Sequence, residues 1–437
     1  MVIVFVLVAL LVLGVVAAAN WYVWRRLFRD TTRGPGRVRR AGAAVVAGGW
    51  ALAVAALVAE RAGAPFWLQR TLAWPGFLWL ALSVYLLLGV AAGELVRPLL
   101  RWLLRRRAPA AEPARTPAPA TAATTPAPAA PDPSHDRPLT GPAPSDDGPL
   151  AEPGPRGDRP LAVPSRRLFV SRVVAGAAAT AAVGIVGHGT YGVLRGPGIK
   201  RVTVPLARLP RAAHGYRIAV VSDIHLGPVL GRGFAQRVVD TVNSTQPDLI
   251  AVVGDLVDGS VEDLRPAAAP LAQLRARHGA YFVTGNHEYF SGAEQWVEEV
   301  RRLGLLPLEN ARRELPHFDL AGVNDVHGED EGRGPDFSKA LGDRDPARAC
   351  VLMAHQPVQI HESVEHGVDL QLSGHTHGGQ LWPGSLIASA ANPTLAGLER
   401  YGDTQLYVTR GAGAWGPPTR VGAPSDITVI ELAALRA

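Results

Sequence analysis

Four long runs of apolar residues in the first half of the chain predict membrane-spanning helices. The runs cover residues 2–24, 41–59, 72–93 and 173–193, and a helix needs about 20 apolar residues to cross a bilayer. No basic segment precedes the first run, so we expect a span there and not a cleaved signal peptide. The pattern therefore predicts an all-α membrane region of about four transmembrane helices.

Arginine clusters alternate with these runs. Residues 25–40 carry seven arginines and one acid, residues 97–107 carry five arginines, and residues 60–71 carry only two. Arginine-rich loops favour the cytoplasmic side of a membrane. We therefore expect a multi-pass cell-membrane protein with an extracytoplasmic N-terminus, two cytoplasmic basic loops, and everything after the fourth run outside. The formal net charge of +6 then reflects topology, and no nucleic-acid partner is expected.

Residues 108–164 separate the three-helix region at 1–107 from the segment 165–196, which contains the fourth apolar run. This segment holds 16 prolines and few large apolar residues, so it cannot bury enough surface to offset the entropy of ordering. We predict a disordered Pro/Ala-rich linker. The Ser165-Arg166-Arg167 sequence that follows fits either a basic flank of a fourth helix or a twin-arginine export signal. Both interpretations send the following residues across the membrane.

From residue 201 to 437, short apolar runs alternate with amphipathic ones, which is typical of an α/β domain. Five of these runs read as strands and end in side chains that bind ligands. A single residue of this kind is more often structural, but the carboxyl ends of strands form the ligand-binding edge of α/β sheets. The only cysteine, Cys350, begins one of the runs and is expected to be a buried structural thiol.

The polar side chains form short motifs at these strand ends. They are Asp223-x-His225, Gly254-Asp255, Gly285-Asn286-His287-Glu288, His355 and Gly374-His375-x-His377. In an extended backbone, the last two histidines would point to the same side. In this order the motifs resemble those of the calcineurin-like metallophosphoesterases, and residues 378–380 and 407–418 are similar to the bacterial membrane-associated branch. The resemblance covers about residues 201–437 and implies a metallophosphoesterase-type αββα sandwich.

By position, the resemblance also implies two divalent metal ions. One would be held by Asp223, His225 and His377, the other by Asn286, His355 and His375, and Asp255 would bridge both. His287 would bind no metal and would protonate the leaving group. Ligands of mixed His, Asp and Asn type suit Mn, Fe or Zn.

These features indicate a membrane-anchored dinuclear-metal phosphoesterase that cleaves phosphoester or pyrophosphate bonds by attack of a metal-bridging hydroxide. The anchor favours a lipid-linked substrate. The alternatives are a general phosphodiesterase acting on soluble nucleotides or sugar phosphates, and a non-catalytic metal-dependent membrane receptor.

Four further residues have two interpretations each. Arg410 and Arg420 are candidate phosphate contacts, with surface charge as the alternative. Asp325 and His327 either line the cleft or belong to a loop. The sequence leaves protein partners open.

Overall fold

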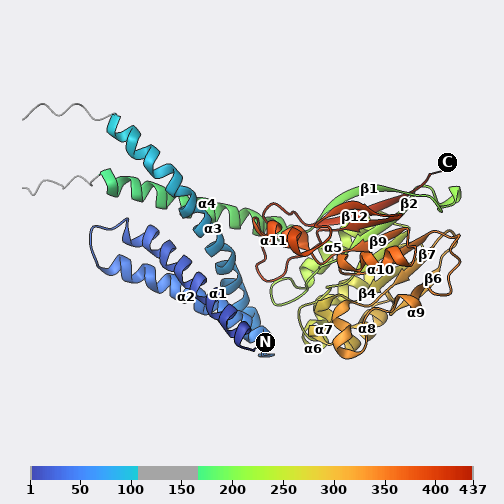
Figure 1. The fold of residues 1–437 in the computed structure, drawn as a ribbon. Coiled ribbons are helices and arrows are strands. Elements are labelled where there is room, and N and C mark those ends of the chain that lie inside the picture. Colours follow the sequence, from blue (N-terminus) through green and yellow to red (C-terminus); the bar gives the residue numbers. More distant parts are fainter. Residues whose placement is uncertain (1, 107–165, 436–437) are drawn as a thin grey trace, which may run out of the picture.

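The protein is described by a computed structural model that covers residues 2–106 and 166–435. The linker predicted over residues 108–164 lies outside the described residues. Four long helices form one part of the molecule, and a two-sheet α/β unit forms the other, with α4 leading directly into β1 (Figure 1).

The membrane part contains α1 (Val2–Trp24), α2 (Arg37–Arg61), α3 (Phe66–Arg106) and α4 (Arg166–Leu194). All four are long and apolar enough to cross a membrane, which agrees with the four long apolar helices predicted from the sequence. A Cβ atom added to Gly93 of α3 would lie 2.4 Å from Val174 of α4. Small residues thus let these two helices approach closely, as is common in membranes.

Helix α3 is longer than the apolar run that predicted it. It has 41 residues, and it takes in both part of the expected loop at 60–71 and the basic segment after residue 97. The helix begins directly after Pro65, whose carbonyl oxygen accepts a hydrogen bond from the Leu68 amide at 2.8 Å. Proline suits the first turn of a helix, and the Leu and Arg residues at the other end are strong helix formers. Helix α3 therefore extends beyond the apolar run at both ends and contains Pro75 and Pro98.

The first sheet has the strand order β1-β12-β2-β3-β4-β5, and the second has the order β10-β11-β9-β8-β7-β6. The strands of the first are β1 (Gly198–Leu206), β2 (Tyr216–Val221), β3 (Leu249–Val253), β4 (Ala280–Val283), β5 (Leu306–Pro307) and β12 (Asp426–Ala434). Those of the second are β6 (Ala311–Glu314), β7 (Asp319–Gly322), β8 (Cys350–Met353), β9 (Leu370–Ser373), β10 (Gly397–Tyr401) and β11 (Thr404–Val408).

One core lies between the two sheets, and further hydrophobic clusters lie outside them. Ile218 of β2 and Val351 of β8 belong to the inner core. Phe234 and Trp296 cover the outer face of the first sheet, and Phe337 covers that of the second. The covering helices are α5 (Arg232–Ser244), α6 (Val261–Ala268), α8 (Ala293–Arg302), α9 (Phe337–Leu341) and α10 (Ile360–Glu365). These layers confirm the predicted metallophosphoesterase-type αββα sandwich.

The strand directions bring the predicted motifs to one edge. Strands β2, β3 and β4 are parallel neighbours, and so are β8 and β9 in the other sheet. Parallel strands place their carboxyl ends at the same edge. The two edges meet where the His375 amide of the second sheet donates to Asp223 Oδ1 of the first at 3.0 Å. Cys350 is buried at the start of β8, and burial raises the pKa of its thiol to about 12.

Candidate metal centre

The structure brings all eight side chains predicted as site residues into one region at the joined sheet edges. Three groups of three have ligand atoms that lie within 4.8 Å of one another, and two of these groups consist of predicted metal ligands alone. The first group comes from the ends of β2 and β9, and the second from the ends of β3, β8 and β9. They are Asp223, His225 and His377, and Asp255, His355 and His375.

In the first group the donor atoms converge without any intervening protein atom. His377 Nε2 lies 3.4 Å from Asp223 Oδ1 and 3.0 Å from His225 Nε2. The Asp223 side chain is fully buried. Burial, opposed by the charge of His355, raises its pKa, because an isolated carboxylate is costly in an apolar surrounding. A cation would compensate that cost.

The second group is completed by the amide of Asn286. Its Oδ1 lies 3.0 Å from His375 Nδ1, and His355 Nε2 lies 3.1 Å from Asp255 Oδ2. The same Asp255 Oδ2 is 3.8 Å from His225 Nε2 of the first group. Asp255 therefore stands between the two groups, where a bridging ligand has to be.

The donor set fits two divalent cations. The Nδ1 atom of His355 lies 2.8 Å from the Val253 carbonyl oxygen, which turns Nε2 towards the site, as outer-shell partners of metal-binding histidines do. This Nε2 atom is buried and has no well-aligned hydrogen-bond partner among the described residues. A buried polar atom without a partner is costly, and a bound cation would remove the cost.

Five of these residues have left-handed backbone conformations. Such values of φ are rare outside glycine and concentrate at functional sites. Because β9 ends at Ser373, the extended geometry does not continue to the last two histidines, and they enter different groups. The condition under which both would point to one side, an extended backbone, is therefore not met. The five, with φ between 49° and 71°, are Asp223, His225, Asp255, His375 and His377.

Asp258 is a site residue that the sequence reasoning missed. Its Oδ1 lies 2.8 Å from His225 Nδ1 and 2.7 Å from His287 Nδ1. Burial opposes ionisation of Asp258, but the charges and hydrogen bonds of the two histidines outweigh it and lower its pKa to about 2. In return, Asp258 outweighs the effect of burial on His287 and raises the pKa of that imidazole to about 9. The only signal in the sequence was its position three residues after Asp255.

The Glu288 side chain connects the loops that follow β3 and β4. Its carboxylate accepts hydrogen bonds from the amides of Gly285 at 2.6 Å, Leu256 at 2.7 Å and Asp255 at 3.0 Å. A Cβ atom at Gly285 would lie 2.3 Å from Asp255 Oδ1, so only glycine fits at the start of α7 (Asn286–Ser291). This packing fixes the position of the shared carboxylate.

The structure also places two residues for which the sequence offered alternatives. Arg420 is buried and does not supply surface charge. Its Nη1 donates to the His377 carbonyl oxygen at 3.1 Å, and its Nη2 lies 3.0 Å from His377 Nδ1. Asp325 is buried too and caps a loop by accepting from the His327 amide at 2.9 Å. Both side chains therefore hold the backbone around the site in position.

A cavity of about 730 Å³ opens onto the two groups of candidate ligands. From the α/β unit it is lined by Asn286, His287, His375, His377 and Trp415, among others. The opposite wall comes from the membrane part, at the end of α2 and the start of α3. It includes Leu57, Glu60, Arg61, Phe66 and Gln69.

Comparison with known proteins agrees with this geometry. Residues 216–379 match the calcineurin-like phosphoesterase family. A transmembrane protein with metallophosphoesterase domain from Danio rerio is 38% identical over 259 residues, which are 56% of this chain and 59% of that protein. The chain thus spans less than two thirds of this curated relative.

Two bacterial proteins, each described as an uncharacterized metallophosphoesterase, are covered more fully. The protein from Helicobacter pylori strain J99 is 38% identical over 58% of this chain and 68% of its own length. That from Aquifex aeolicus is 32% identical over 54% of this chain and 91% of its own length. Among solved structures, the phosphopantetheinyl hydrolase PptH from Mycobacterium tuberculosis is 13% identical with a TM-score of 0.29, over 45% of this chain and 89% of that one. A similarity of that size does not bear on function. The extent of the Helicobacter and Aquifex matches shows that the chain belongs to the calcineurin-like metallophosphoesterases.

Proposed function

We propose that this protein is a membrane-anchored phosphoesterase, of the membrane-associated branch of its family, that hydrolyses phosphoester or pyrophosphate bonds of a lipid-linked substrate. The observation that carries the proposal is the composition of the cavity. The candidate metal ligands form one wall, and the ends of two membrane helices form the other. A substrate that reaches the metal centre therefore lies against the end of the membrane region.

The membrane wall suits an amphiphilic substrate. Phe66 and Leu57 offer apolar contact, whereas Arg61 offers a positive charge for a phosphate. A soluble nucleotide needs no apolar wall at the end of a transmembrane hairpin. The wall therefore favours a substrate with an acyl or isoprenoid part.

A short helix beside the metal centre adds a second apolar surface. Helix α11 (Gly384–Ala391) has no buried residue, and Leu386 and Ile387 are 68% and 77% exposed. The segment is attached to the membrane part, because the Tyr85 hydroxyl donates to the Trp382 carbonyl oxygen at 2.9 Å. Figure 1 shows α11 on the side of the α/β unit that faces the long helices. Large exposed apolar side chains at this position favour contact with lipid.

The chemistry follows from the side chains around the cavity. Two bound divalent cations would act as Lewis acids and lower the pKa of a water molecule. Asp223 and Asp255 supply two negative charges against the four positive charges of such a pair, which leaves a positive site for an anionic phosphate. Asp258 holds Nδ1 of His287, so Nε2 is the nitrogen that can give a proton to the leaving oxygen.

Substrate class is tested by comparing full-length protein on two substrates after loading with Mn²⁺. We expect hydrolysis of phospholipid or lipid pyrophosphate vesicles to exceed that of a soluble diester. Phe66→Ala should raise KM for the lipid roughly tenfold, as expected for lost apolar contact, and leave KM for the soluble diester unchanged. The matched control is Trp67→Ala, because Trp67 is 68% exposed and does not line the cavity. Equal KM changes for both substrates would favour a general phosphodiesterase.

We also propose that the α/β unit lies on the extracytoplasmic side. The basic segments meet at one end of the helix group, where Arg172 Nε donates to the Thr31 carbonyl oxygen at 3.0 Å and Arg101 and Arg166 line one hollow. The α/β unit is attached at the opposite end of α4 (Figure 1). Arginine clusters favour the cytoplasm, which supports this orientation. Whether Ser165-Arg166-Arg167 also acts as a twin-arginine signal stays a prediction.

Sidedness is tested by labelling intact cells with a membrane-impermeant maleimide. The native thiol of Cys350 is buried, so background labelling is low. Asp403→Cys places a thiol in the exposed turn between β10 and β11, and Gly34→Cys places one in the first basic loop, where nothing lies within 4 Å. We expect the thiol at position 403 to react in intact cells and that at 34 only after lysis. The reverse pattern would place the metal centre in the cytoplasm.

A further inference from the structure

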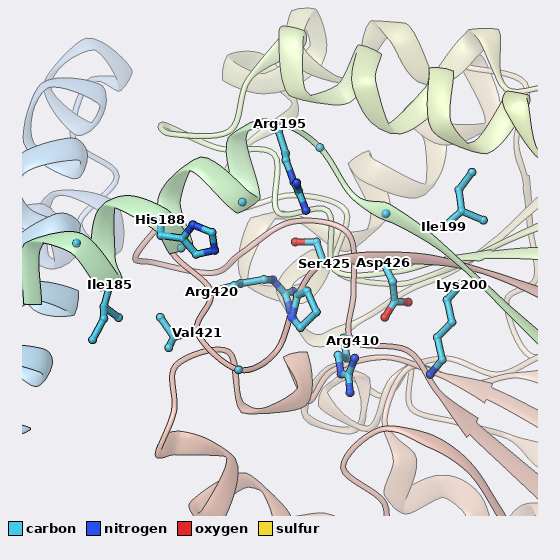
Figure 2. Close-up of a pocket in the computed structure, with 17 residues that line it drawn as sticks. Ile185, His188, Arg195, Ile199, Lys200, Arg410, Arg420, Val421, Ser425 and Asp426 are labelled. Atoms are coloured by element: carbon cyan, nitrogen blue, oxygen red, sulfur yellow. The ribbon is translucent and has the colours of Figure 1, made fainter. Parts of the chain in front are cut away.

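A second cavity, of about 760 Å³, lies where α4 meets the α/β unit (Figure 2). Its walls are the last turns of α4, the start of β1, Arg410, and the segment 420–426. It shares no lining residue with the cavity of the candidate metal centre. Nothing in the proposed hydrolysis uses it.

The cavity is strongly basic. Four cationic side chains line it against the single carboxylate of Asp426, and that carboxylate already accepts hydrogen bonds from the Thr409 and Thr428 hydroxyls at 2.9 and 2.8 Å. None of the four forms an ion pair with a carboxylate within the described part of the chain. Arg420 donates to backbone carbonyl oxygens instead, among them that of Gly413, and Lys200 lies over the Tyr407 ring. The cations are Arg195, Lys200, Arg410 and the buried Arg420.

The polar groups line the cavity from two sides. In Figure 2, Arg195 extends from the end of α4 towards Ser425, and Lys200 and Arg410 lie on the other side of the segment that carries Ser425. The Ser425 hydroxyl oxygen is buried and has no hydrogen-bond partner among the residues that the structure describes. Cations that have no carboxylate partner, together with a buried hydroxyl that has no partner, are donors that match the oxygens of a phosphate.

The position of the cavity along α4 corresponds to the surface of a bilayer. Helix α4 has 29 residues, which is about 44 Å at 1.5 Å per residue, whereas the hydrocarbon layer is about 30 Å thick. With Arg166 and Arg167 at one interface, the residues from about His188 to Arg195 fall in the headgroup layer at the other. Ile185, one turn deeper, is exposed and lines the same cavity. The order along the helix is therefore apolar first and cationic second, as in a phospholipid.

We propose that this cavity binds the headgroup phosphate of an anionic phospholipid in the leaflet that adjoins the α/β unit. Arg195, Lys200 and Arg410 bind the phosphate oxygens, and Ile185 contacts the glycerol and upper acyl chain. Arg420 connects this cavity to the metal centre through its contact with the His377 carbonyl oxygen. Bound lipid thus holds the α/β unit in its place on α4.

The test uses full-length protein in detergent. The protein is first treated with a chelator, so that metal ions in the metal centre do not bind the lipid phosphate. Dioctanoyl phosphatidylglycerol is titrated, and bound lipid is counted by native mass spectrometry. We expect one saturable site whose affinity for phosphatidylglycerol exceeds that for dioctanoyl phosphatidylcholine. Arg195→Gln and Lys200→Gln should each weaken phosphatidylglycerol binding about tenfold, which is the usual effect of losing one charged hydrogen bond.

Arg211→Gln is the matched control, because Arg211 is exposed at the start of the short 3-10 turn that follows β1 (Arg211–Ala213). The substitution removes the same charge without touching the cavity. Two cavity variants are used in case one of them does not fold, and a thermal melting curve of each variant shows whether it is folded. Equal binding of phosphatidylglycerol by wild-type protein and both cavity variants would overturn the proposal. Inorganic phosphate that displaces the lipid at equal concentration would also overturn it, since the site would then recognise free phosphate. Loss of binding in Arg211→Gln as well would show non-specific charge attraction and would refute a built site.

Discussion

Asp255→Ala should remove most of the bound metal and nearly all phosphoesterase activity. Its carboxylate lies 3.1 Å from His355 Nε2 in one group of candidate ligands and 3.8 Å from His225 Nε2 in the other. Losing a residue that only orients a ligand lowers metal affinity or activity by about 10- to 100-fold, so loss of a shared ligand should cost more than about 100-fold. The primary measurement is the metal content of the purified full-length protein, determined by inductively coupled plasma mass spectrometry.

The appropriate control is Asp240→Ala, which removes an exposed carboxylate from α5. That protein should retain two metals per chain and full activity. If Asp255→Ala keeps two metals and loses only activity, Asp255 acts on the substrate and the ligand assignment fails. If it fails to fold, Asp255→Asn retains the shape of the side chain and answers the same question.

The sequence is sufficient to predict the strand ends that form the centre. Each of the motifs follows an apolar run, and the parallel order of β2, β3 and β4 brings their carboxyl ends together. That inference needed only local pattern and the general geometry of α/β sheets. The apolar runs likewise predicted four membrane helices, because length and hydropathy are properties of one segment at a time.

Features that depend on contacts between distant segments could not be predicted in this way. Asp258 contacts both His225 and His287 because a turn places it between them. The spacing of residues in the sequence does not predict that position. The left-handed backbone at His375 and His377 is imposed by the surrounding packing, against the usual preference of these residues. The membrane wall of the metal cavity brings residues near Phe66 to those near His287, across more than 200 positions of sequence.

His287→Ala should separate the proton donor from the metal ligands. His225, Asp255 and His287 also place their ligand atoms within 4.8 Å of one another, so geometry alone would permit His287 to bind a metal. Its Nδ1, however, lies 2.7 Å from Asp258 Oδ1, and the hydrogen bond and charge of Asp258 outweigh burial and raise the pKa of the imidazole. We therefore expect both metals to remain and turnover of esters with poor leaving groups to fall about 10²- to 10⁴-fold, the usual contribution of a general acid.

The dependence on leaving group distinguishes this role from a structural one. A p-nitrophenolate needs no proton to depart, so its release in His287→Ala should be much closer to the wild-type rate than that of an alkyl alcohol. Asp258→Asn offers a companion measurement, because Asp258 contacts His225 as well as His287. That variant should lose about 10- to 100-fold in activity and show weakened metal binding too. A parallel fall of metal content and turnover in His287→Ala would identify His287 as a ligand, and the leaving oxygen would then have to take its proton from another group.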